Sequence, residues 1–303
     1  PLATHGWQAP MDTPLPLVHF LSNGRYGTLI TNSGAGFSQW EGLALTRWRA
    51  DTTLDDWGCW LYVQEPATRA IWSLGRQPIH RRGDFEEVIY HPHMAEFRRR
   101  DADIALNMQL TIAPDDDVEI RRIDLTNNSD EARTLRLTTY GEPVLAPPAG
   151  DARHQAFAKL FVESEYVADI NTLLFRRRPR SEDEKPKVLA HLLVMAQGKA
   201  TGAHESDRAR FLGRGHTNRY PAMLINGEEL SGTTGATLDP IMALGQDVLL
   251  EPHASVQLAV ITLTANSRQE ALNLARRYQA WATIERAFQR ARIAAEQELR
   301  QLG

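Results

Sequence analysis

Residues 118–140 read VEIRRIDLTNNSDEARTLRLTTY, and this stretch decides the fold. Apolar and polar side chains alternate over 118–125 and again over 135–140, and the polar cluster at 127–130 is a turn signal. Such alternation is typical of antiparallel strands with one face in a core and the other in solvent. The stretch therefore predicts two half-buried antiparallel strands joined by a turn.

The same pattern of short runs and turns recurs on both sides of this stretch. Turn signals include PDDD at 114–117 and PPAG at 147–150. The runs expected to be strands are 26–31, 60–64, 87–91, 95–100, 104–112, 118–127, 132–142, 156–166, 172–177, 188–197 and 255–264. Many strands over roughly 250 residues predict a mainly β chain, a large antiparallel sandwich of two sheets rather than an immunoglobulin-like unit of about 100 residues.

The C-terminal end has the period of a helix. SRQE at 267–270 is a capping-box pattern with Ser267 as the N-cap. Apolar residues then recur at three- and four-residue steps, at Leu274, Tyr278, Trp281, Phe288, Ala291, Ala295, Leu299 and Leu302. We expect one apolar stripe on helix, with a break near 279–283.

These patterns divide the chain into three parts. Residues 1–16 are rich in proline and are expected to form an extended lead-in, residues 17–265 the sandwich, and residues 266–303 a helical linker. The charged segment 178–187 and the Gly/Ser/Thr segment 228–237 are expected to be exposed loops.

Composition limits the classes of function. The chain has 303 residues, of which 42% are hydrophobic and 24% charged, and a net charge of −4. Nothing therefore steers it toward nucleic acid or an anionic membrane, and no run of about 18 apolar residues predicts a membrane span. The chain has no signal-peptide pattern and no initiator Met, which indicates a piece of a longer protein, and the single Cys59 fits a reducing compartment.

Tryptophan, glycine, arginine and aspartate are concentrated in residues 22–60, SNGRYGTLITNSGAGFSQWEGLALTRWRADTTLDDWGCW. An indole can stack on the C–H face of a pyranose while Arg and Asp bind its hydroxyls. A β-sheet core with turn glycines is the alternative, because Trp is usually buried. The candidate carbohydrate-binding residues of this stretch are Arg25, Trp40, Arg47, Trp48, Asp51, Trp57 and Trp60.

A second cluster, RARFLGRG at 208–215, combines three arginines with two glycines in an expected loop. Planar guanidinium groups there could recognise hydroxyls, carboxylate or phosphate, so Arg210 and Arg214 join the candidates. A surface loop held through Asp207 is the alternative.

His91 and His93 share a strand face, but Pro92 and the lack of a third ligand argue against a metal pair. Phosphate loops, dinucleotide fingerprints and nucleophile elbows are also missing, so we predict no cofactor and no metal.

Four ordered motifs stand in the N-terminal part: NGRYG at 23–27, NSGAGFS at 32–38, LTRWRAD at 45–51 and WGCWLY at 57–62. They resemble the N-terminal domain of family 94 glycoside phosphorylases, with a stronger likeness to the phosphorylase-like region of bacterial cyclic β-1,2-glucan synthases. The resemblance is collinear over roughly 17–303 and includes WS at 72–73, QP at 77–78, 118–128, HQAFAKLFVESEY at 154–166 and 207–215.

The resemblance implies a galactose-mutarotase-like β-supersandwich, a helical linker, and a following (α/α)6 barrel. In this family the catalytic Asp and the phosphate site belong to the barrel, so we expect no catalysis by this chain alone. The family's sandwich contributes to dimerisation, and one segment approaches the partner's active site. Residues 154–159 are similar to that segment. The phosphorylases carry an Arg in this neighbourhood and this chain has Lys159 nearby instead, and Lys159 is included among the candidate sugar contacts. The resemblance also implies a cytoplasmic location, in a parent protein of the inner membrane.

Three functions stay open. The leading expectation is a non-catalytic accessory domain of a β-glucan phosphorylase or cyclic β-1,2-glucan synthase, acting in glucan binding, chain-length control, dimerisation or barrel support. Its expected partners are β-glucan, with β-1,2 linkage favoured, the barrel and a second copy. The second is an autonomous carbohydrate-binding module, which exposed tryptophans would favour. The third is a mutarotase-like aldose epimerase, whose His/Glu acid–base pair could come from His80, His91, His154 and Glu142.

Overall fold

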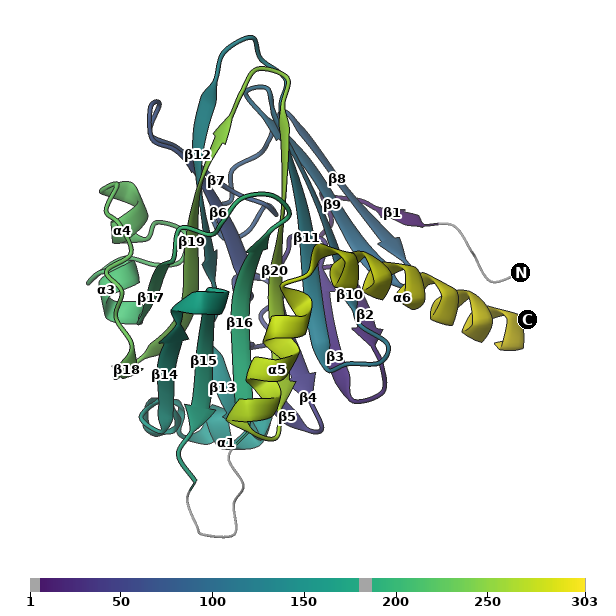
Figure 1. Ribbon diagram of the computed structural model, residues 1–303, viewed down its shortest axis with the longest axis vertical. Helices are drawn as coiled ribbons and strands as arrows, with labels where there is room; N and C mark the ends of the chain where they lie inside the picture. Colours follow the sequence, from purple (N-terminus) through teal and green to yellow (C-terminus); the bar gives the residue numbers. More distant parts are fainter. Residues whose placement is uncertain (1–5, 180–186, 303) are drawn as a thin grey trace.

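The computed structural model describes residues 6–179 and 187–302 and shows three antiparallel β-sheets with helices at the C-terminal end (Figure 1). The ten-stranded sheet has the order β1 (Trp7–Ala9), β8 (Phe85–His91), β9 (Met94–Asp101), β10 (Ile104–Ile112), β11 (Val118–Asn127), β20 (Ser255–Ala265), β16 (Val188–Met195), β15 (Thr172–Arg177), β14 (Val162–Val167) and β18 (Gly235–Ala236). The mainly β prediction is confirmed.

Two five-stranded sheets complete the sandwich. One has the order β17 (Ala203–Asp207), β19 (Pro240–Leu250), β12 (Arg133–Tyr140), β6 (Trp60–Glu65) and β7 (Ala70–Ser73). The other has the order β13 (Pro143–Ala146), β5 (Leu43–Thr46), β4 (Gly36–Trp40), β3 (Tyr26–Thr31) and β2 (Val18–Ser22). One core cluster joins all three sheets, with Leu106 from β10, Leu137 from β12 and Trp40 from β4 among its members.

The number of sheets differs from the prediction of two. The chain passes directly from β12 to β13, but the ladder is interrupted at this junction. Gly141 makes only an isolated bridge to Met242, and Pro143 has no N–H to donate. A side chain at Gly141 would also meet Met242 Cε at 2.4 Å. One predicted layer is thus divided into two sheets at this corner.

The two strands predicted from residues 118–140 lie in different sheets. β11 belongs to the ten-stranded sheet and β12 to a five-stranded sheet, so the turn between them crosses the sandwich. Asn127 is fully buried at this crossing, and its amide donates to the carbonyl oxygens of Glu131, Leu250 and Glu251 at 2.7, 3.2 and 3.2 Å. The side chain therefore satisfies backbone groups where the ladder ends.

One local prediction is wrong, and one long strand was missed. Residues 156–166 were expected to be one strand, but α2 (Gln155–Lys159) precedes β14. Two alanines and a lysine in this segment favour helix, and α1 (Pro148–Arg153) leads directly into it. The strand β19 was not predicted, because it begins with Pro240 and contains Gly245. A side chain at Gly245 would lie 3.1 Å from Ala203 Cβ, so close packing of β17 explains the glycine.

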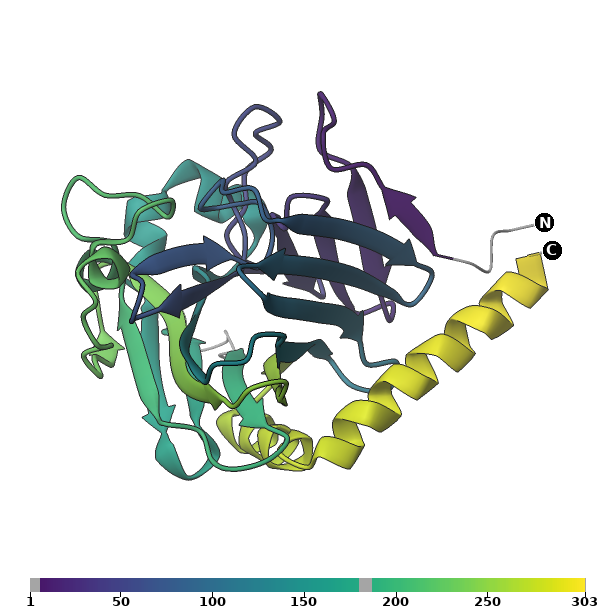
Figure 2. The same ribbon diagram turned by 90° about the horizontal axis from the view of Figure 1, so that it is seen from above.

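The C-terminal helices agree with the prediction. Ser267 accepts a hydrogen bond from the Glu270 amide at 3.2 Å, and α5 (Arg268–Tyr278) is followed by α6 (Trp281–Leu302). Helix α5 packs on β16 and β20, whereas α6 passes β10 and runs on beyond the sheet (Figures 1 and 2). Among the described residues, no helix is both long and apolar enough to span a membrane.

Three segments complete the chain. The lead-in over 1–16 contains β1, which pairs with β8. The loop predicted over 178–187 lies mostly outside the described residues. Residues 228–237 are irregular apart from β18. The remaining short helices are η1 (Ala168–Ile170), α3 (Arg208–Leu212) and α4 (Ala222–Ile225).

Candidate functional site

The tryptophans of residues 22–60 fall into two environments. Trp40 and Trp60 are 2% and 4% exposed and belong to core clusters, so packing explains their presence. Trp48 and Trp57 are half-buried, and Trp48 packs on Phe37 with ring centroids 5.0 Å apart. Trp57 lines a pocket together with Glu142, whereas Trp48 does not.

Glu142 is the centre of a buried ionic network. It follows β12, and its carboxylate accepts from Arg47 Nη1 at 2.8 Å, Tyr140 Oη at 2.8 Å and Arg208 Nε at 3.0 Å. Arg47 comes directly after β5 and Arg208 begins α3, so three distant parts of the chain meet here. The side chains of Arg47 and Glu142 are only 1% and 5% exposed.

Three more charges extend this network. Asp151 of α1 accepts from Arg47 Nε and Nη2 at 3.0 and 2.9 Å, a bidentate pair. Lys159 ends α2, and its Nζ lies 2.6 Å from Asp239 Oδ1 and 3.9 Å from Glu142 Oε2. Helices α1 and α2 are thereby tied to the edge of the sandwich. We call these seven residues the Glu142 network: Arg47, Tyr140, Glu142, Asp151, Lys159, Arg208 and Asp239.

The network fixes the protonation state of Glu142. Burial alone would raise the pKa of this carboxyl, but Arg208, Arg47 and Lys159 outweigh burial, and the pKa lies below its ordinary value. Glu142 is therefore a carboxylate at neutral pH and has no proton to donate. Because the Glu142 carboxylate is paired with cations from several segments, it holds these segments together.

A pocket of about 450 Å³ opens over Glu142 and Arg208. This volume lies within the range of ligand pockets, roughly 300–1,000 Å³. We call it the Trp57 pocket. Its walls come from the loop before β6, the loop after β7 and the loop after α3, and its other lining residues are Thr53, Leu54, Asp56, Trp57, Gln77, Pro78, His80, His216, Thr217, Asn218 and Arg219.

Local contacts position Trp57 at this pocket. Asp51 accepts from the amides of Thr53 and Leu54 at 2.9 and 3.0 Å and so closes the turn that leads to the indole. The Arg49 guanidinium carbon lies 5.5 Å from the Trp57 ring centroid, a cation–π distance. Asp51, predicted as a sugar contact, serves the turn in this structure.

Asn218, one of the lining residues, has an unsatisfied acceptor. Asn218 Oδ1 is buried and has no hydrogen-bond partner among the described residues. Its backbone carbonyl is fixed by the Tyr62 hydroxyl, which donates to it at 2.7 Å. A buried amide oxygen without a donor is uncommon, and a ligand hydroxyl would satisfy it.

The predicted candidates are only partly brought together. Trp57 lines the Trp57 pocket, and Arg47 and Lys159 lie in the network beneath it. Arg25 and Trp40 line a separate pocket beside α5. Trp48 packs on Phe37, Trp60 lies in the core, and neither lines the Trp57 pocket.

The 208–215 cluster is not the expected loop. Its first half is α3, capped by Asp207, which accepts from the Ala209 amide at 2.9 Å. Arg210 and Arg214 are exposed, and Arg210 Nε lies 4.0 Å from Asp207. Arg208, which was not selected as a candidate, is the arginine of this cluster that reaches the pocket. The start of α3 did have a signal in the sequence, because Asp207 is a residue type that favours the N-cap position.

The mutarotase-like alternative requires a histidine hydrogen-bonded to a carboxylate in the cleft. His80 and His216 line the Trp57 pocket, but neither bonds Glu142 in the described part of the chain. His91 Nε2 lies 3.6 Å from Glu96, on the β8–β9 hairpin, and His154 is exposed. Over residues 6–179 and 187–302, no group of three or more His, Cys, Asp or Glu residues is arranged to hold a metal.

Comparisons with known proteins place this geometry in context. The profile described as "Glycosyl hydrolase 94, supersandwich domain" matches residues 6–280. Cyclic beta-(1,2)-glucan synthase NdvB of Rhizobium meliloti is 31% identical over 284 residues, which are 93% of this chain and 10% of that protein. N,N'-diacetylchitobiose phosphorylase of Vibrio furnissii is 23% identical over 282 residues, 91% of this chain and 34% of that protein.

Solved structures share the fold. A bacterial glucoamylase complexed with acarbose has a TM-score of 0.53 at 9% identity, covering 96% of this chain and 38% of that chain. The chain thus spans about a tenth of the synthase and about a third of the phosphorylase that it matches.

Proposed function

Since the chain belongs to the glycosyl hydrolase 94 supersandwich family, we propose that it is a non-catalytic, carbohydrate-binding accessory domain of a longer β-glucan-processing enzyme. The proposed ligand is a β-glucan, with β-1,2 linkage favoured because the relative at 31% identity is a cyclic beta-(1,2)-glucan synthase. Control of glucan length is part of the same proposal, because the glucan would be held at this domain.

The Trp57 pocket carries this proposal. A half-buried indole offers a stacking face, and Asn218 Oδ1, which has no partner among the described residues, offers an acceptor for a sugar hydroxyl. Arg208, whose side chain is 34% exposed, adds guanidinium donors at the floor. An aromatic face with fixed donors and acceptors is what a pyranose ring needs.

The same site argues for binding rather than chemistry. Cleavage of a glycosidic bond requires a group that protonates the leaving oxygen. The lowered pKa of Glu142 removes it from that role at neutral pH, because Arg208, Arg47 and Lys159 hold it ionised. We therefore assign Glu142 a structural role beneath the pocket.

Calorimetric titration of the chain with linear β-1,2-glucan tests the proposal. We expect a dissociation constant of about 1 mM and a loss of about tenfold in Trp57→Ala, because the stacking face is removed. Trp7→Ala is the matched control, since Trp7 is 52% exposed on β1 and does not line the Trp57 pocket. Equal weakening in the two variants, or no heat with any glucan, would refute the site. Release of glucose 1-phosphate by the chain alone would refute the non-catalytic assignment.

Helix α6 supports a second part of the proposal, namely contact with the remainder of a longer parent protein. Its distal half runs beyond the sheet (Figure 2), and Ile293 is 47% exposed there. In the full-length parent protein we expect Ile293→Asp to lower the melting temperature. In the 303-residue chain the same change should leave it within error. An equal effect in both proteins would contradict this contact.

A further inference from the structure

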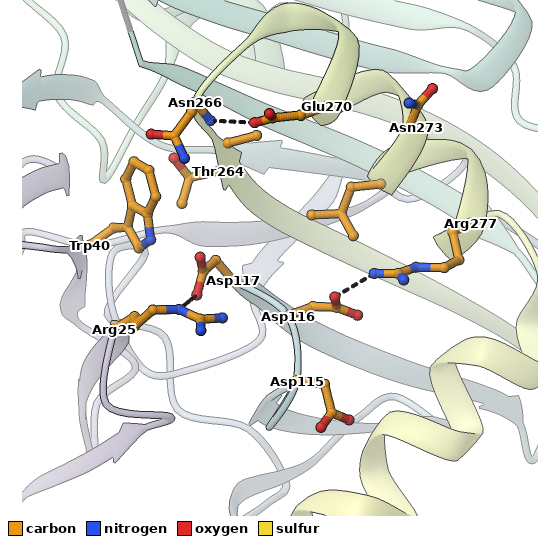
Figure 3. Close-up of a pocket in the computed structure, with 12 residues that line it drawn as sticks. Arg25, Trp40, Asp115, Asp116, Asp117, Thr264, Asn266, Glu270, Asn273 and Arg277 are labelled. Carbon is orange, nitrogen blue, oxygen red and sulfur yellow. Dashed lines mark hydrogen bonds and ion pairs between the residues drawn. The ribbon is translucent and has the colours of Figure 1, made fainter. Parts of the chain in front are cut away.

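A second pocket, of about 480 Å³, lies between the β2–β3 hairpin, the turn before β11 and helix α5 (Figure 3). We call it the α5 pocket. It shares no lining residue with the Trp57 pocket. We propose that the α5 pocket is a separate binding site for a neutral, polyhydroxylated ligand of monosaccharide size.

The wall of this pocket contains an unsatisfied donor. Trp40 is 2% exposed, and its indole Nε1 has no hydrogen-bond partner in the described part of the chain. Figure 3 shows this nitrogen on the side of the ring that faces Arg25 and Asp117. Leu274 of α5 adds an aliphatic surface. The wall thus combines an apolar surface with a donor that the protein leaves unused.

The rim places donors beside acceptors. Arg25 Nε donates to Asp117 Oδ1 at 2.9 Å, and Arg277 Nη2 donates to Asp116. Each guanidinium has further N–H groups that these contacts leave over. Asn273 accepts from Gln269 through Oδ1, so its amide N–H groups are also left for another acceptor. Neighbouring donors and acceptors of this kind match adjacent hydroxyls, each of which donates and accepts.

The charges of the lining disfavour anionic ligands. Four carboxylates and two guanidinium groups line the pocket, so an anion such as a phosphate ester is repelled. The carboxylates are also engaged: Asp115 lies 2.6 Å from Arg290 Nη1, and Glu270 accepts from the Asn266 amide at 3.1 Å. Asp116 and Asp117 are paired with Arg277 and Arg25, so within the described residues each of the three aspartates already has a guanidinium partner. A neutral polyol is the ligand class that these engaged charges and the unused donors favour.

Indole N–H spectra can test this site separately from the proposed function. The chain is labelled with ¹⁵N on its seven tryptophans, assigned by Trp→Phe variants, and titrated with glucose. We expect the Trp40 resonance to shift and saturate at about 1–10 mM. Asn273→Ala should weaken this binding at least fivefold, whereas Gln269→Ala on the same helix should leave it within twofold. Trp57→Ala should not change it.

Three results would overturn this proposal. If the Trp40 resonance does not move, the α5 pocket is not a sugar site, even if the Trp57 resonance responds to glucan. If glucose 1-phosphate shifts Trp40 as strongly as glucose does, the ligand class is wrong. A shift that survives Asn273→Ala unchanged would also overturn the site, provided that thermal melting shows the variant folded.

Discussion

The Glu142 network and the rim of the α5 pocket use the same residue types in opposite surroundings. The side chains of Arg47 and Glu142 are 1% and 5% exposed, whereas those of Arg25 and Asp117 are 52% and 16% exposed. Removing one member of the first pair leaves buried charges unpaired, but water can replace a partner at the rim. The same arginine–carboxylate contact is therefore part of the fold in one place and open to a ligand in the other.

Glu142→Gln should give the largest loss of stability. Arg47, Arg208 and Lys159 each lose one negatively charged partner in a buried site, so we expect the free energy of unfolding to fall by about 3–5 kcal/mol. Asp117→Asn at the rim is the matched control, with an expected loss of less than about 1 kcal/mol. Urea unfolding followed by far-UV circular dichroism measures both. Similar losses in the two variants would remove the contrast.

Acid should lower the stability that the Glu142 network contributes. The Glu142 pKa is held below its ordinary value of 4.5, despite burial, by Arg208, Arg47 and Lys159. The unfolded chain therefore binds this proton first as pH falls. The stabilisation is fully present above pH 4.5 and is lost as pH falls below it toward the folded-state pKa. Below this pH the wild-type chain should lose stability more steeply than Glu142→Gln in urea unfolding. Parallel curves would show that Glu142 is not the titrating group.

Lys159→Met should have an intermediate effect. Its side chain is 11% exposed, and it lies 2.6 Å from Asp239. Glu142 retains Arg47 and Arg208 in this variant, so we expect a loss of about 1–3 kcal/mol, less than for Glu142→Gln. Urea unfolding of the two variants side by side gives the order. A larger loss from Lys159→Met would move the centre of the network to Asp239.

Arg25→Ala should have the smallest effect. Its pair with Asp117 is solvent-exposed, so the free energy of unfolding should change by less than about 1 kcal/mol, and less still in high salt. The control is Arg47→Ala, in which Glu142 and Asp151 both lose a buried partner. A loss from Arg25→Ala as large as that from Arg47→Ala would contradict an open rim.

Local sequence patterns predicted much of the fold. Short runs between turn signals predicted β3, β10, β11 and β15 to the residue, and Ser267 with Glu270 predicted the start of α5. These signals are local, because side-chain period and capping depend on near neighbours. The division into three sheets was not predictable in this way, since it depends on Gly141 meeting Met242 across the fold.

The candidate site was harder to predict for the same reason. Arg47 is 95 positions from Glu142 and 104 from Asp151, so no spacing pattern connects them. Trp57 and Trp60 are tryptophans only three positions apart, yet Trp57 lines a pocket and Trp60 lies in the core. Only the tertiary fold decides between a sugar contact and a packing residue.

Binding of glucan at Trp57, above a purely structural ionic network, can be observed directly in the indole ¹H–¹⁵N spectrum of the chain titrated with linear β-1,2-glucan. We predict that the Trp57 resonance shifts and saturates in the millimolar range, while the Trp7 resonance stays in place. A Trp57 resonance that does not move, or that moves no more than that of Trp7, would contradict glucan binding at the Trp57 pocket.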